Sequence, residues 1–100
     1  MTIEIKKTGA DAVIELSGRL DTTTAPVLEK TISEDISEST NLTLDLKGLE
    51  YISSAGLRVL LSAQKRMQKY GSMKLRNICE EIMDIFEMTG FASILSLEAE

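Results

Sequence analysis

The sequence contains no histidine and only one cysteine in 100 residues, and these absences exclude several kinds of site. Catalytic Ser-His pairs, phosphohistidine carriers and His-ligated metal ions all need an imidazole. A cysteine-based zinc site or redox pair needs a second thiol. Cys79 therefore cannot form an internal disulfide, and we expect it to be a packed, inert thiol. We expect neither a metal ion nor a cofactor.

Long apolar runs, glycine-rich loops and clusters of positive charge are also missing. No apolar run approaches the roughly 20 residues of a membrane-spanning helix, and the N-terminus does not resemble a signal peptide. The six glycines are scattered and form no nucleotide-binding loop. Eleven Lys and Arg against sixteen Asp and Glu give a net charge of −5, whereas nucleic-acid binding depends on positive charge. We expect a cytoplasmic protein with no nucleic-acid partner and no direct membrane insertion.

The composition that remains is that of an ordinary globular domain. Hydrophobic residues make up 43% of the chain and charged residues 27%, which is too apolar for a disordered chain. A chain of this length buries well over half of the surface that its unfolded form exposes. We therefore expect one domain covering residues 1–100.

Short segments with a two-residue apolar period alternate with segments of helical period. We expect strands around Ile3–Ile5, Ala12–Leu16, Leu42–Leu46 and Met73–Leu75, with a further short strand at Ile94–Leu97. The helices are expected from Thr22 to Ile36, from the Ser53-Ser54 pair to Tyr70-Gly71, and from Asn77 to Thr89-Gly90. Met67, Met73, Met83 and Met88 fall at positions that favour filling of the core.

This order of elements predicts an α/β fold. The pattern predicts a hairpin for the first two strands. The remaining strands are separated by helices, which indicates a mixed, largely parallel sheet of four to five strands. Apolar and polar residues alternate along the first four strands. We therefore expect the helices mainly on one face of the sheet, with the other face partly in water.

The turn from Tyr51 to Gly56 joins the central strand to the central helix. The first N–H groups of a helix lack partners, and the positive end of its dipole points at the residues before it. A serine there usually caps the helix, and its hydroxyl is also well placed to carry a phosphate. Ala55 is small and Gly56 has no side chain, so we expect another protein to approach this turn closely, with Ser54 presented on its surface.

Three motifs together resemble the STAS domain of bacterial anti-sigma factor antagonists. They are Gly18-Arg-Leu-Asp21, Asp45-Leu-Lys-Gly-Leu-Glu-Tyr-Ile-Ser-Ser-Ala-Gly-Leu57, and Asn77 followed by a helix that ends at Thr89-Gly90-Phe91. The resemblance extends from about Ile3 to Leu97. It implies a single STAS domain over nearly the whole chain.

The resemblance also implies a phosphorylation site. The usual turn of the family is Asp-Ser-Ser/Thr-Gly-Leu, and the serine two residues before the glycine is phosphorylated; that serine matches Ser54. Ser53 occupies the place of the aspartate and is an alternative acceptor. Asp21 matches an acidic position beside the site, although a surface carboxylate or a cap for the next helix is an equally good interpretation. The implied docking surface comprises Asp21, Thr22, Thr23, Ser53, Ser54, Ala55, Gly56 and Arg58.

The function that the resemblance implies is non-enzymatic partner switching. An unphosphorylated antagonist binds an anti-sigma factor, which is itself a serine kinase, and thereby releases the sigma factor. Phosphorylation ends the binding and a serine phosphatase restores it. Such a protein would itself catalyse no reaction.

Two other functions are compatible with the residues. The first is a constitutive accessory subunit of a larger assembly, such as a lipid-transport ATPase complex, and the missing aspartate before Ser54 favours it. The second is an enzyme that uses Ser54 as a nucleophile. The sequence disfavours this enzyme because it offers no histidine and no evident lysine base near Ser54.

Overall fold

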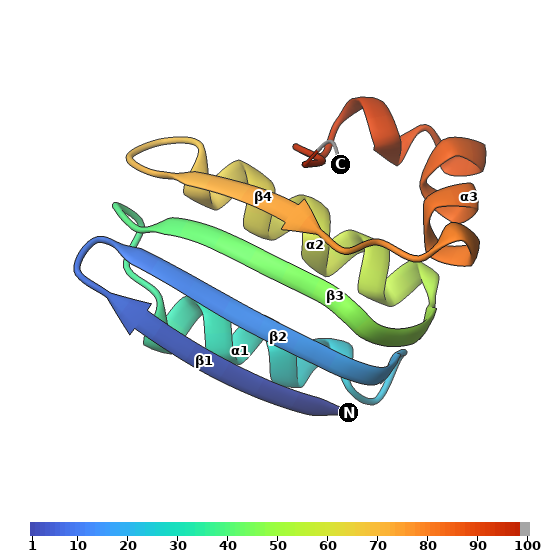
Figure 1. Ribbon diagram of the computed structural model, residues 1–100, viewed down its shortest axis with the longest axis horizontal. Coiled ribbons are helices and arrows are strands. Elements are labelled where there is room, and N and C mark those ends of the chain that lie inside the picture. Colours follow the sequence, from blue (N-terminus) through green and yellow to red (C-terminus); the bar gives the residue numbers. More distant parts are fainter. Residues whose placement is uncertain (99–100) are drawn as a thin grey trace.

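Four strands form one mixed sheet in the order β1-β2-β3-β4 in the computed structural model, which describes residues 1–98 (Figure 1). β1 and β2 are antiparallel, whereas β3 runs parallel to both β2 and β4. The elements in chain order are β1 (Thr2–Thr8), β2 (Asp11–Leu20), α1 (Ala25–Asp35), β3 (Asn41–Ile52), α2 (Ser54–Met67), β4 (Ser72–Arg76), α3 (Glu80–Thr89) and the 3₁₀ helix η1 (Phe91–Ser93). The predicted fold class is confirmed.

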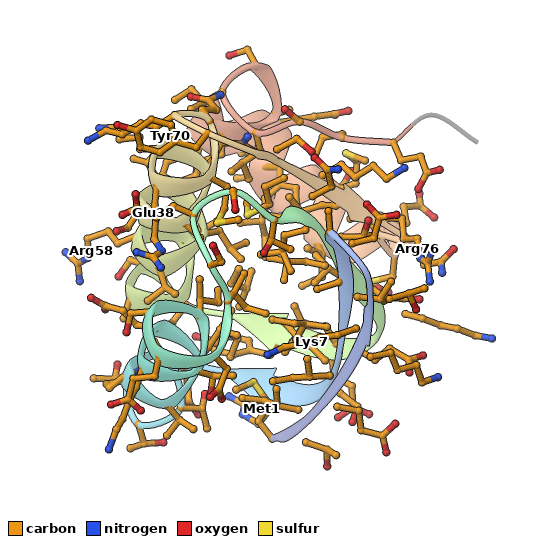
Figure 2. All side chains as sticks on the ribbon, turned by 90° about the vertical axis from the view of Figure 1, so that its left-hand side faces the viewer. Met1, Lys7, Glu38, Arg58, Tyr70 and Arg76 are labelled. Atoms are coloured by element: carbon orange, nitrogen blue, oxygen red, sulfur yellow. The ribbon has the colours of Figure 1, made fainter. Side chains whose placement is uncertain are left out.

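The helices α1 and α2 cover the same face of the sheet (Figure 1). Each connects one parallel strand to its immediate neighbour, and both connections step across the sheet in the same direction. Parallel crossovers share one hand, so two such steps place both helices on one side. The opposite face carries polar side chains, and Figure 2 shows Arg58 and Arg76 on opposite sides of the molecule.

The core lies between the sheet and these two helices. Ile14, Leu44 and Leu75 come from three neighbouring strands and are completely buried. Leu28 of α1 and Leu60 of α2 are also completely buried. The alternating strand pattern and the helical spacing therefore predicted the buried faces correctly, because each pattern follows from the geometry of a single element.

The C-terminal part of the chain differs from the expectation of a fifth strand. Residues 91–93 form the helix η1, and Ile94 keeps a helical backbone conformation. Within residues 1–98, residues 94–97 contribute only a single parallel bridge, between Leu97 and Leu75. The amide of Leu75 donates to the Ser96 carbonyl at 2.9 Å, and the amide of Glu98 donates to the Leu75 carbonyl at 2.8 Å. This segment borders β4 without becoming a full strand.

Two further expectations are wrong at helix surfaces. α2 ends at Met67, so Tyr70 lies beyond the helix and is 72% exposed. Met88 is 85% exposed because α3 turns Ile82 and Phe86 toward the core and position 88 away from it. Within residues 1–98, no helix reaches the length and apolarity that crossing a bilayer requires.

Asp45 is a buried carboxylate, 6% exposed, that ties β3 to the end of β4. Its Oδ2 accepts from Arg76 Nε at 3.2 Å, its Oδ1 accepts from the Lys47 amide at 3.0 Å, and Asn77 Nδ2 donates to both oxygens. Asn77 has a positive φ of 55°, a conformation that asparagine tolerates better than most residues. The carboxylate therefore fixes the point where the chain leaves β4 for α3.

The close approach of α2 to β2 depends on Gly56, in the first turn of the helix. A Cβ at this position would lie 2.8 Å from Leu20 Cγ, 2.9 Å from the Leu20 carbonyl oxygen and 2.9 Å from Ile52 Cγ1. Only a residue without a side chain fits there. The glycine thus serves internal packing, beneath the surface on which the sequence analysis placed it.

Asp45 should make stability dependent on pH. Burial disfavours its charged form, but the hydrogen bonds from Lys47, Asn77 and Arg76 outweigh this effect and hold its pKa below the ordinary value. A lowered folded-state pKa gives stabilisation that is complete above the unfolded pKa of about 4 and is lost as the pH falls through it toward the folded value. Urea unfolding at several pH values measures this loss.

The variant Asp45→Asn should lose about 1–3 kcal/mol of unfolding free energy at neutral pH. Its NH₂ group would face the donors of Lys47, Arg76 and Asn77, which the carboxylate oxygens accept in the wild type. It should also show a shallower loss of stability in acid than the wild type. Asp84→Asn, on the exposed surface of α3, is the matched control and should change little. Equal acid profiles for the wild type and Asp45→Asn would contradict the assignment.

Gly56→Ala tests the packing of α2 against β2. Alanine favours helix by up to about 1 kcal/mol over glycine, so a free helix surface would be stabilised. We expect the opposite sign here, a loss of about 1–3 kcal/mol, because the new methyl group meets the Leu20 carbonyl. Thermal unfolding followed by circular dichroism measures the change, and a stabilised variant would show that the approach is looser than described.

Candidate partner-docking site around Ser54

The Ser53-Ser54 turn and the loop after β2 lie side by side at the end of the sheet where the parallel strands β2 and β3 terminate (Figure 1). β2 and β3 are parallel, and their last residues, Leu20 and Ile52, are paired. The segments that follow the two strands therefore begin next to each other. The amide of Ser53 donates to the Leu20 carbonyl at 2.9 Å. The structure thus brings together the two segments from which the sequence analysis built its docking surface.

Ser53 is the N-cap of α2, as the simplest interpretation of the serine pair predicted. Its hydroxyl accepts from the Gly56 amide at 3.3 Å, and its carbonyl accepts from the Leu57 amide at 2.9 Å. The residue is half-buried in the turn. Its side chain is therefore occupied by the helix that it begins.

Ser54 is the first residue of α2 and is exposed. In the part of the chain that the structure describes, its hydroxyl makes no hydrogen bond, in contrast to that of Ser53. The first-turn amides beside it belong to the positive end of the helix dipole. This arrangement presents an uncommitted hydroxyl in surroundings that tolerate negative charge.

Asp21 organises the neighbouring loop. Its Oδ1 accepts from the Thr23 hydroxyl at 2.8 Å, the Thr23 amide at 3.0 Å and the Thr24 amide at 3.1 Å. The hydrogen bond from the Thr23 hydroxyl and then that from the Thr24 amide lower the pKa of Asp21 below its ordinary value. The carboxylate thus holds the turn that precedes α1, whose N-cap is Thr24, and Oδ2 lies 3.9 Å from Arg19 Nε.

A stacked pair beside the turn was missed by the sequence analysis. The guanidinium carbon of Arg19 lies 4.2 Å from the centre of the Tyr51 ring, and both side chains reach solvent. The two residues occupy paired positions in β2 and β3, close to the ends of both strands. The sequence alone does not reveal this stack, because Arg19 and Tyr51 are 32 residues apart and meet only through the parallel register of β2 and β3.

The helices α1 and α2 leave a hollow of about 460 Å³ next to Ser54. Thr22, Ala55 and Arg58, three of the predicted docking residues, line it together with Pro26 and Val59. Arg58 projects away from the sheet in Figure 2. Thr23 is exposed in the adjoining loop, whereas Gly56 is buried. The candidate surface therefore consists of a loop, an exposed serine and a shallow groove whose lining includes both Arg58 and Glu29.

Comparison with known proteins agrees with this architecture. A family model described as STAS domain matches residues 2–100. The anti-sigma-B factor antagonist of Bacillus subtilis is 29% identical over 101 residues, which cover 100% of this chain and 93% of that protein. A solved anti-sigma factor antagonist from Mycobacterium paratuberculosis has a TM-score of 0.86 at 24% identity, covering 99% of this chain and 86% of that chain.

SpoIIAA, an anti-sigma factor antagonist, has the same fold. Its unphosphorylated form has a TM-score of 0.80 at 19% identity, covering 99% of this chain and 90% of that chain. The phosphorylated form of SpoIIAA from Bacillus has a TM-score of 0.71 at 17% identity, covering 99% of this chain and 93% of that chain. The family model spans nearly all of the sequence, and the solved structures share its sheet and helices. This protein therefore belongs to the STAS domain family, which includes the anti-sigma factor antagonists that it resembles.

Proposed function

We propose that the protein is an anti-sigma factor antagonist that binds an anti-sigma factor serine kinase when Ser54 is unphosphorylated and thereby releases a sigma factor. Phosphorylation of Ser54 ends the binding, and a serine phosphatase restores it. The observation that carries this proposal is the exposed, uncommitted hydroxyl of Ser54 at the start of α2. The names of the related proteins, and a solved phosphorylated form of SpoIIAA, support it.

The geometry favours Ser54 over Ser53 as the phosphate acceptor. The Ser53 hydroxyl accepts the Gly56 amide, and its removal from this bond would cost about 1 kcal/mol of helix capping. Ser54 gives up no such bond. A kinase can therefore reach the hydroxyl of Ser54 without opening the first turn of α2.

A phosphate at Ser54 would affect the interface more than the fold. It adds about −1.5 to −2 charges at neutral pH to a protein whose net charge is already −5. The positive end of the α2 dipole offsets part of this charge within the protein. A partner surface fitted to a bare hydroxyl has no such compensation, and a loss of about 2.7 kcal/mol weakens binding about a hundredfold.

The docking surface that we propose is centred on Ser54. Asp21, Thr22 and Thr23 contribute the neighbouring loop, and Ala55 and Arg58 contribute the beginning of α2. Ser53 caps the first turn of α2, and Gly56 lets this turn pack closely against β2, so both support the surface without being exposed parts of it. The Arg19–Tyr51 stack lies at the same end of the sheet, near the last residues of β2 and β3, and extends this surface with an aromatic ring.

A constitutive accessory subunit, for example of a lipid-transport ATPase complex, is the second candidate function. Ser53 favours it, because this residue stands where the usual phosphorylated turn has an aspartate and is occupied as a cap. Copurification separates the two functions. A kinase that dissociates on phosphorylation supports the antagonist, whereas a stable complex with a transporter ATPase supports the accessory subunit.

Incubation with the cognate kinase and ATP, followed by mass spectrometry, should locate one phosphate on Ser54. Ser54→Ala should abolish it. Ser53→Ala should remain a substrate while losing about 0.5–2 kcal/mol of stability, because it removes the cap. Phosphorylation of Ser54→Ala to full stoichiometry would contradict the assignment.

Ser54→Asp should weaken kinase binding at least tenfold while the protein stays folded, because a carboxylate in the first turn is compatible with the helix dipole. Isothermal titration calorimetry measures the affinity. Ser93→Asp introduces the same charge at an exposed position in η1 and should bind like the wild type. Equal affinity of both variants would place the interface elsewhere.

A further inference from the structure

β1 forms one border of the sheet, and within residues 1–98 no segment pairs with its outer edge (Figure 1). We propose that this edge pairs with β1 of a second copy of the chain. The two strands run antiparallel, related by a two-fold axis through Ile5, and join the two sheets into one. The proposal does not rest on the function proposed above.

The charges along β1 select this register. Antiparallel partners lie on the same face of a sheet, so an axis perpendicular to the sheet must pass through a residue. Thr2, Glu4 and Lys6 share the open face of the sheet, as their pairing with Ser17, Glu15 and Val13 shows. An axis at Ile5 places Glu4 of each copy opposite Lys6 of the other.

The neighbouring registers are unfavourable. An axis at Glu4 would place two glutamates face to face, and an axis at Lys6 would do the same with two lysines. Like charges directly opposite each other destabilise a strand pair, whereas opposite charges stabilise it. Among these three registers, the charge order therefore favours the one centred on Ile5.

Within one copy the charge of Glu4 is only partly compensated, by a longer-range attraction to Lys6. It lies directly opposite Glu15 of β2, and Lys6 forms its ion pair with Glu15, at 2.8 Å. Glu4 makes no ion pair in the described part of the chain, residues 1–98. Lys6 of the second copy would give Glu4 the cation that its own strand neighbour does not supply.

The apolar side of β1 is also incompletely covered. Ile3 and Ile5 are half-buried, although their β2 partners Leu16 and Ile14 are 2% and 0% exposed. The proposed pairing brings Ile5 of one copy against Ile5 of the other. It therefore removes apolar surface from water on one face while it pairs charges on the other.

The dimer should be weak and specific. Stable interfaces bury roughly 1,200–2,000 Å², and one pair of seven-residue strands buries less than this. We expect dissociation in the high micromolar range. Lysines on an edge normally discourage pairing with other chains. In the proposed dimer Glu4 of the second copy compensates Lys6, whereas Lys7 lies opposite Ile3 and contributes no charge pair.

The test uses charge reversal in the full chain. In Glu4→Lys, lysines oppose lysines across the axis, and in Lys6→Glu, glutamates oppose glutamates. Each single variant should dimerise at least tenfold more weakly than the wild type in sedimentation equilibrium. An equimolar mixture of the two should recover association, because every pair across a mixed interface is then Glu opposite Lys. Glu29→Lys, on the exposed surface of α1, is the control for net charge and should behave like the wild type.

Circular dichroism melting establishes that each variant is folded before it is compared. A wild-type protein that stays monomeric at millimolar concentration would overturn the proposal. So would single variants that associate like the wild type, or a mixture that associates no better than its components. Glu4 and Lys6 lie outside the Ser54 surface, so kinase binding by Glu4→Lys and Lys6→Glu reports on that surface independently of dimerisation.

Discussion

The hydrogen bond from the Ser53 amide to the Leu20 carbonyl, 2.9 Å long, ties the start of α2 to the end of β2. Gly56 allows this contact because a side chain there would collide with Leu20. The same helix start frees the Ser54 hydroxyl and leaves Ser53 to cap the first turn. The exposure of one serine thus depends on a backbone contact between two strands and a helix, not on the turn sequence alone.

A second constraint acts on the open face of the sheet. Asp45 joins β3 to Arg76 and Asn77, and it is among the few polar residues that the described chain buries. Its carboxylate compensates the donors that converge where β4 ends, so removing the charge leaves those donors facing one another. The buried side of the sheet is held by apolar packing, whereas ion pairs such as Asp45–Arg76 and Lys6–Glu15 link the strands on this side.

Much of the fold could be predicted from the sequence because its signals are local. The alternation at Ile14 and Leu44 and the spacing of Leu28 and Ile32 each report the geometry of one element. The serine cap and the left-handed Gly90 are likewise read from a few neighbouring residues. The errors at Tyr70 and Met88 arose where a helix ends or turns away from the core, which tertiary packing decides.

The site was predicted less completely than the fold. Ser54 and the Asp21 loop were proposed from their motifs, but the hydrogen bonds by which Asp21 holds Thr23 and Thr24 became visible only in the structure. The Arg19–Tyr51 stack and the hydrogen bonds from Asn77 to Asp45 join residues about 30 positions apart in the sequence. Such contacts depend on strand register, which the periodicity of separate strands does not specify.

The position of Tyr51 has a practical consequence. The chain has no tryptophan and two tyrosines, of which Tyr51 lies under Arg19 beside the Ser54 turn and Tyr70 follows the far end of α2. Intrinsic fluorescence therefore comes from one ring next to the candidate interface and one remote from it. Replacing Tyr70 with phenylalanine would leave a single native fluorophore whose emission reports arrival of a binding protein, without any attached dye.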